Sequence, residues 1–200
     1  GPEDHVLDSN NVLVLTHRMT KENGKVAMSP RLIGKTLVDQ ERVAAEGGLY
    51  VELLASADHV FNLGMTLKDQ QDALVQAIDE ARESVGVETR ISQTIVRHYG
   101  PDKAIAAAKA IVEHPHPYFT GFQMAGAEDA HTPADFRPAY DMAAEAGLRC
   151  TAHTGEWLGP DSIRETLAAL PMVERLGHGV RAIHDADLVR ELAERQMPFE

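Results

Sequence analysis

The stretch LRCTAHTGEWLGPDSIRETLAALPMVERLGHGV, residues 148–180, places two short β-prone runs on either side of a segment with helical periodicity. The first run ends in polar residues at 153–156, and Pro160 is well placed to begin a helix that carries Ile163 and Leu167 on one face. A strand, a helix and a second strand in this order form the unit from which parallel sheets are built. The stretch therefore predicts a parallel α/β sheet.

The same alternation continues on both sides of this unit. Further β-prone runs are GLYVELLAS (48–56), TRISQTIVRHY (89–99), YFTGFQMAG (118–126) and a terminal MPFE (197–200), with longer stretches of helical period between most of them. This pattern predicts helices packed on one parallel sheet.

The helix ends between these runs can also be located. Thr66 is the expected N-cap of one helix, with Asp69 three residues later completing a capping box. Thr132-Pro133 opens a second helix that stops at Gly147, and Asp185 begins the last one. Residues 1–30 are the least readable part of the chain, with a turn expected at Lys21–Lys25.

Composition restricts the function classes. The chain has 200 residues, 44% of them hydrophobic, which is the ordinary range for one globular domain. A net charge of -12 disfavours nucleic acid and favours a neutral or cationic small molecule. No apolar run is long enough for a membrane span, and the single Cys150 excludes an internal disulfide. We expect a cytoplasmic protein.

Three of the predicted strands end in residues that can do chemistry. His153 and Glu156 close one strand, His178 lies between two glycines at the end of the next, and Gly126 follows an earlier one. Because the carboxyl ends of parallel strands share one edge, these residues are expected to meet there. Taken singly, each also fits a surface histidine with a hydrogen-bond partner, a solvated acid or a glycine turn. Together they indicate a metal or proton-transfer site.

Several motifs resemble the adenosine deaminase family, especially its bacterial members. They are HTGE at 153–156, LGHG at 176–179, GFQMAG at 121–126 and GPDSI at 159–163, supported by VRHYGP at 96–101 and YVELLASADH at 50–59. The resemblance runs from about Leu49 to Glu200. It implies a (β/α)8 barrel of the metal-dependent hydrolase type that converts adenosine or deoxyadenosine to inosine and ammonia in purine metabolism, with one divalent ion, usually zinc, at the barrel mouth.

The resemblance also implies a role for each candidate residue. His153 would be a metal ligand, and Glu156 would donate a proton to purine N1. His178 would orient and help deprotonate the metal-bound water, and the Gly126 N–H would hold the purine ring. As a proton donor, Glu156 needs a desolvated pocket that raises its pKa. The implied partner is a small-molecule purine nucleoside, and the oligomeric state stays open.

Part of the family pattern does not occur in this sequence. The His-x-His ligand pair of the family's first strand and the Asp-Asp pair of its eighth are both missing, and only strands two to six and the start of seven can be assigned. We therefore expect residues 1–200 to form a single deaminase barrel domain truncated at both ends, inactive by itself. His114 and His116 have the i, i+2 spacing but fall before a strand, at the opposite end of a barrel from the metal. His98 is expected to have a structural role or to support a ligand.

Two other readings remain open. One is an adenine or other aminopurine deaminase, since Gln123, Ala127 and Thr154 depart from common family residues and leave the exact substrate undecided. The other is a non-catalytic barrel remnant that binds a purine or a partner chain, which the missing ligand pairs favour.

Overall fold

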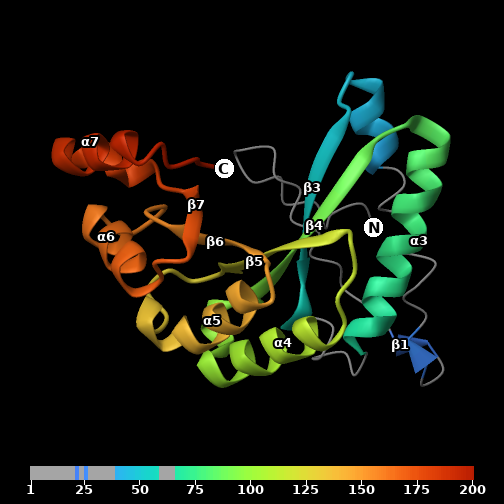
Figure 1. Ribbon diagram of the computed structural model, residues 1–200, viewed down its shortest axis with the longest axis horizontal. Helices are drawn as coiled ribbons and strands as arrows, with labels where there is room; N and C mark the ends of the chain where they lie inside the picture. Colours follow the sequence, from blue (N-terminus) through green and yellow to red (C-terminus); the bar gives the residue numbers. More distant parts are fainter. Residues whose placement is uncertain (1–20, 23–24, 27–38, 59–65) are drawn as a thin grey trace. The chain divides into compact units, whose positions relative to one another are not determined.

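The computed structural model describes residues 21–22, 25–26, 39–58 and 66–200 (Figure 1). They fall into two compact units, which are treated separately here. The first runs to Ser92 and includes His116–Phe119, and the second holds Gln93–Pro115 and Thr120–Glu200.

The first unit begins with two short strands, β1 (Lys21–Glu22) and β2 (Lys25–Val26), which pair antiparallel. The turn predicted here centres on residues 23–24, which lie outside the described residues. A helix over 39–45, strand β3 (Tyr50–Ser56) and helix α3 (Leu67–Val85) follow.

Strand β4 (Glu88–Val96) passes from the first unit into the second, and the remaining elements alternate between strands and helices. In chain order they are η1 (Arg97–Tyr99), α4 (Pro101–Glu113), β5 (Phe119–Ala125), η2 (Pro133–Phe136), α5 (Arg137–Glu145), β6 (Arg149–Thr154), α6 (Pro160–Ala169), β7 (Val173–His178), η3 (Val180–His184) and α7 (Ala186–Glu194).

The larger sheet has five strands in the order β3-β4-β5-β6-β7, which is also their order in the sequence (Figure 1). Strand β6 pairs in parallel with β5 on one side and with β7 on the other. At the end of the chain, Phe199 forms a parallel bridge with Leu176 of β7, so the MPFE segment adds to the sheet as predicted. The prediction of a parallel α/β sheet is confirmed.

The predicted helix ends are also confirmed. Thr66 and Asp69 form a reciprocal capping box at the start of α3. The side chain of Asp185 accepts hydrogen bonds from two backbone N–H groups of α7. Gly147, just beyond α5, has a left-handed φ of 84°, a conformation that costs glycine little.

Each unit has its own apolar core. In the first, a cluster of buried side chains comes from β3, α3 and β4 together with Phe119. In the second, the rings of Phe122 and Tyr140 meet edge to face with centroids 5.1 Å apart. The buried Tyr140 hydroxyl donates to the Thr151 carbonyl at 2.6 Å, which fixes α5 on β6. This packing holds the carboxyl end of β6 in place.

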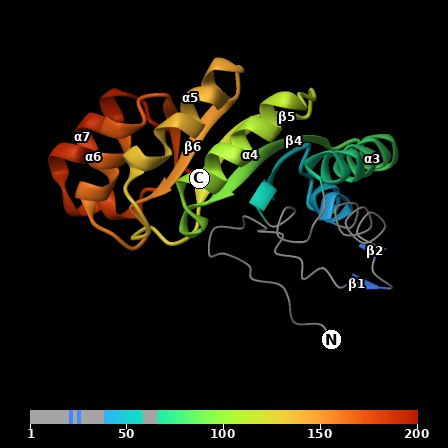
Figure 2. The same cartoon turned by 90° about the horizontal axis from the view of Figure 1, so that it is seen from below.

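Helices α4 to α7 follow one another around strands β5 to β7 (Figures 1 and 2). Among the residues that the structure describes, no helix is long and apolar enough to cross a membrane.

Candidate active site

The register of β6 and β7 brings the two predicted histidines to one edge of the sheet. His153 is paired with Gly177, and Thr154 is paired with His178. The rings of His153 and His178 meet edge to face, with centroids 4.9 Å apart and an interplanar angle of 86°. The prediction that these strand ends lie together is therefore confirmed in the described chain.

A left-handed backbone at His178 makes this ring contact possible. In a regular strand His178 would point to the same face as its register partner Thr154, whose hydroxyl is buried against Ser162 of α6. His178 instead has φ of 64°, a conformation that is uncommon for residues other than glycine. The left-handed turn directs the His178 side chain toward His153. The imidazole is placed there at a small cost in backbone conformational energy.

Glu156 completes the group. Its Oε2 atom lies 3.4 Å from Nε2 of His178. The His178 side chain is only 8% exposed, whereas that of Glu156 is 43% exposed, so in the described chain the carboxylate lacks the desolvated pocket expected for a proton donor. Two imidazoles and a carboxylate at the carboxyl ends of adjacent parallel strands can exchange protons, and a single imidazole can serve as one metal ligand.

Gly126 lies at the end of the neighbouring strand β5, with a φ of 97°. A Cβ added there would lie 2.9 Å from Nδ1 of His98 and 3.2 Å from Cγ1 of Val96, so only glycine fits. The next residue, Ala127, donates its N–H to His98 Nδ1 at 3.5 Å. His98 therefore contacts the loop after β5, and the purine contact of the Gly126 N–H stays a prediction.

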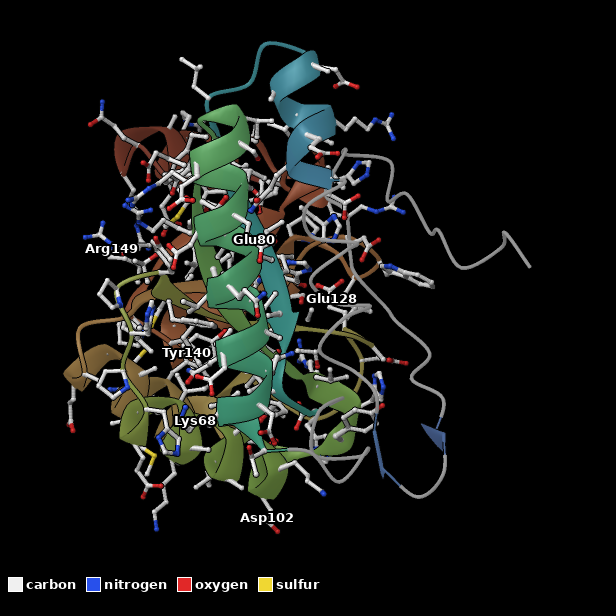
Figure 3. All side chains as sticks on the ribbon, turned by 90° about the vertical axis from the view of Figure 1, so that its right-hand side faces the viewer. Lys68, Glu80, Asp102, Glu128, Tyr140 and Arg149 are labelled. Atoms are coloured by element: carbon white, nitrogen blue, oxygen red, sulfur yellow. The ribbon has the colours of Figure 1, made fainter. Side chains whose placement is uncertain are left out.

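Sequence reasoning missed Glu128, which comes from the loop between β5 and η2 and is labelled in Figure 3. Only 7% of this residue is exposed, yet its carboxylate accepts hydrogen bonds from the loop that carries Glu156. Burial acts to raise the pKa of Glu128, but hydrogen bonds from the Leu158 N–H, the Ser162 hydroxyl and neighbouring groups outweigh it and lower that pKa. No local motif marks such a residue, because its donors lie 26–34 positions away in the sequence.

The only thiol takes no part in this site. Cys150 is 1% exposed near the start of β6, and burial raises its pKa to about 12. A thiol with that pKa stays neutral and inert near neutral pH. Cys150 is therefore not a candidate nucleophile.

The arrangement of His153 suits a metal ligand. Its ring lies against the backbone of Gly177, where an added Cβ would be 2.1 Å from Cδ2 of the ring, so the glycine forms a cradle that fixes the imidazole. Within residues 39–58 and 66–200, however, no group of three or more His, Cys, Asp or Glu side chains could hold a metal ion. His153 thus fits as one ligand of a divalent metal, and a complete set needs further ligands.

The histidine pair with ligand-like spacing lies elsewhere. His114 caps the end of α4, and His116 Nδ1 accepts a hydrogen bond from the Tyr118 N–H at 3.2 Å in the turn before β5. These local contacts give both histidines a structural role in the turn before β5.

Replacing Gly177 with alanine tests the cradle. The added methyl group would overlap the His153 ring, so we expect the ring to shift, the protein to lose about 1–3 kcal/mol of stability and metal affinity to fall. Thermal unfolding and metal titration of the purified full-length gene product measure both effects. Gly159→Ala is the matched control, because no atom lies within 4 Å of its added Cβ. Equal metal affinity in Gly177→Ala and wild type would contradict the cradle.

Comparison with known proteins places this arrangement in a family. The sequence profile described as "Adenosine deaminase" matches residues 36–200. The chain is 39% identical over 160 residues to an adenine deaminase of a Chelativorans species, covering 80% of this chain and 49% of that protein. It is 42% identical over 152 residues to an adenine deaminase of Agrobacterium fabrum, covering 76% and 46%. The chain thus spans about half the length of the curated relatives it matches.

Solved structures with a similar fold agree with the sequence comparison. The fold superimposes on an adenine deaminase from Arthrobacter aurescens with a TM-score of 0.79 and 30% identity, covering 86% of this chain and 52% of that one. It also superimposes on an amidohydrolase from Burkholderia ambifaria with bound zinc, with a TM-score of 0.81 and 26% identity, covering 86% and 47%. The expected fold, part of a TIM barrel of the metal-dependent hydrolase type, is confirmed. With residues 36–200 matched and relatives at about 40% identity, the chain belongs to the adenosine deaminase family.

Proposed function

We propose that this chain carries the central part of the active site of a hydrolase that deaminates a 6-aminopurine, with adenine as the preferred substrate. In the proposed reaction water replaces the 6-amino group, so adenine and water give hypoxanthine and ammonia. The observation that carries the proposal is the meeting of His153, His178 and Glu156 at the ends of two adjacent parallel strands. Membership of the adenosine deaminase family supports the reaction type.

Each residue has a defined task in this proposal. Glu156 donates a proton to purine N1, which makes C6 electrophilic, and His178 orients the attacking water and accepts its proton. Their separation of 3.4 Å also lets the carboxylate hold the His178 ring in place. The Gly126 N–H holds the purine, because the chain bends there and glycine has no side chain of its own.

His153 would hold a divalent metal, and the zinc in the Burkholderia ambifaria structure supports zinc as that ion. When bound, such a metal lowers the pKa of water toward neutrality and so supplies a nucleophile at physiological pH. The other ligands would come from outside the described cluster.

The choice of adenine rests on the relatives. Those reported above are named adenine deaminases, as is the 30% identical Arthrobacter structure. Adenosine, which the motif resemblance favoured, is the second candidate and is supported by the family name alone.

Comparing substrates tests this choice. We expect the full-length gene product to release ammonia from adenine with a kcat/KM about 10²-fold higher than from adenosine or AMP, because a site closed around the bare base has no place for the ribose hydroxyls. A coupled ammonia assay on the three substrates, with equal metal loading, gives the ratio. A faster adenosine reaction would reverse the substrate assignment, and no turnover of any purine would favour the non-catalytic remnant.

A further inference from the structure

The buried Glu128 carboxylate is the centre of a hydrogen-bond network that the proposed reaction does not use directly. Its Oε1 accepts from the Ser162 hydroxyl at 2.7 Å, the Thr154 hydroxyl at 3.2 Å and the Gly155 N–H. Its Oε2 accepts from the N–H groups of Trp157 and Leu158 at 2.9 Å and 3.0 Å. Both oxygens are therefore occupied by donors from the last residue of β6, the loop that follows it and the first turn of α6.

Glu156 lies in the middle of the segment that this network holds. The N–H groups on either side of it, at Gly155 and Trp157, both point at Glu128. The other side of the loop is fixed by Arg181, whose Nε donates to the Glu156 carbonyl at 3.1 Å and whose N–H donates to the Gly155 carbonyl at 2.9 Å. The Glu156 side chain is left to face His178 at 3.4 Å.

The loop that carries Glu128 is anchored by a buried cation, Arg97. Arg97 is 3% exposed, and its Nε and Nη2 atoms donate to the carbonyls of Ala130 and His131 at 2.7 Å and 2.9 Å. These bonds hold the loop that presents Glu128. Burial lowers the pKa of Arg97, and the negative charge of Glu128 is the largest opposing influence, so the two charges stabilise each other.

The network requires an ionised carboxylate. All five contacts to Glu128 come from N–H or O–H donors, which a carboxylate can accept on both oxygens. A glutamine of the same size would present an NH2 group to some of those donors and leave them unsatisfied. Glu128→Gln keeps the volume of the side chain and is therefore expected to release one side of the loop through lost hydrogen bonds alone.

We propose that Glu128 is the positioning residue for the Glu156 loop: its carboxylate binds the backbone of residues 155–158 and so sets the place of the Glu156 side chain. For its effect on catalysis, this inference rests on the proposed function, in which Glu156 is the proton donor. The claim that Glu128 holds the loop in place does not depend on the proposed function.

Amide exchange tests the loop directly. In the full-length gene product, Glu128→Gln should speed hydrogen exchange at the N–H groups of Gly155, Trp157 and Leu158 by about tenfold or more relative to wild type. Trp157 is the only tryptophan among residues 1–200, so its fluorescence anisotropy, measured with any tryptophan outside these residues replaced by phenylalanine, should fall as well. Glu145→Gln, the same substitution on an exposed position at the end of α5, is the matched control and should change neither signal. Unchanged exchange at these amides in Glu128→Gln would overturn the proposal.

A double-mutant cycle tests the effect on catalysis. We expect Glu128→Gln to lower kcat by about 10²-fold with little change in KM or metal content, since small displacements of a catalytic group cost rates of this order. In a Glu156→Gln background the same change should cost almost nothing further, because the group being positioned is already lost. Additive losses would show that Glu128 acts through general stability and would overturn the positioning role.

A milder variant covers the case in which Glu128→Gln fails to fold. Ser162→Ala removes the 2.7 Å donor to Oε1 and keeps the three loop N–H bonds. It should lower kcat several-fold with the same non-additivity toward Glu156→Gln, and a wild-type kcat would contradict the network. If the wild-type protein turns over no purine at all, the proposed function fails. Amide hydrogen exchange in residues 155–158 of the Ser162→Ala and Glu128→Gln variants would still show whether Glu128 positions the loop.

Discussion

Replacing Glu156 with glutamine in the full-length gene product is expected to lower kcat by about 10²–10⁴-fold while metal content stays at the wild-type level. Glutamine has nearly the same size and can keep the contact to His178, but it has no proton to transfer to purine N1. The loop should keep its shape, because its hydrogen bonds to Glu128 and Arg181 use the backbone of residues 155–158 and not the Glu156 side chain. Steady-state kinetics and metal analysis of the same preparation measure both quantities.

A control variant and the metal content of Glu156→Gln itself help to interpret this result. Glu145→Gln, on an exposed position at the end of α5, makes the same chemical change away from the site and should leave kcat unaltered. The acid role is wrong if Glu156→Gln keeps near wild-type turnover, or if its loss of activity simply follows a loss of metal. A retained metal with collapsed turnover separates the proton donor from the ligand.

The sequence predicted the elements of the fold well because their signals are local. Alternating apolar runs mark the strands, and caps such as Thr66 with Asp69 mark helix starts within three residues. Asp185 was found in the same way and caps α7. The helix over 39–45 was not predicted, since it precedes the alternating pattern of strands and helices that begins at residue 48.

The candidate site was predictable in part. His153, His178 and Glu156 follow strand ends, and the parallel sheet forces strand ends together, so their meeting could be expected. The left-handed backbone at His178 could not, because histidine carries no general preference that demands it. Glu128 and Arg97 escaped for a different reason: their partners are backbone groups about 30 residues away, and backbone groups have no sequence signature.

The second large effect is expected at His153. Its ring is fixed from two directions, by the Gly177 backbone below it and by the edge-to-face contact with His178. Such immobilisation is typical of metal ligands, whose orientation must be set before the metal binds. His153 is partly buried at the end of β6, and its pairing with Gly177 uses backbone atoms, which an alanine would keep.

His153→Ala in the full-length gene product is therefore expected to weaken metal binding by about 10²-fold or more and to reduce turnover in proportion to the metal lost. Zinc titration and deamination rates at increasing zinc concentration check this, and activity should recover only where zinc is raised well above its wild-type requirement. His184→Ala, at an exposed position in η3, is the control and should bind zinc normally. Because Glu156→Gln keeps its metal and His153→Ala loses it, the two variants distinguish proton transfer from metal binding. A His153→Ala protein that holds zinc one to one at wild-type affinity would show that this imidazole is not a ligand, and that its contact with His178 serves the fold alone.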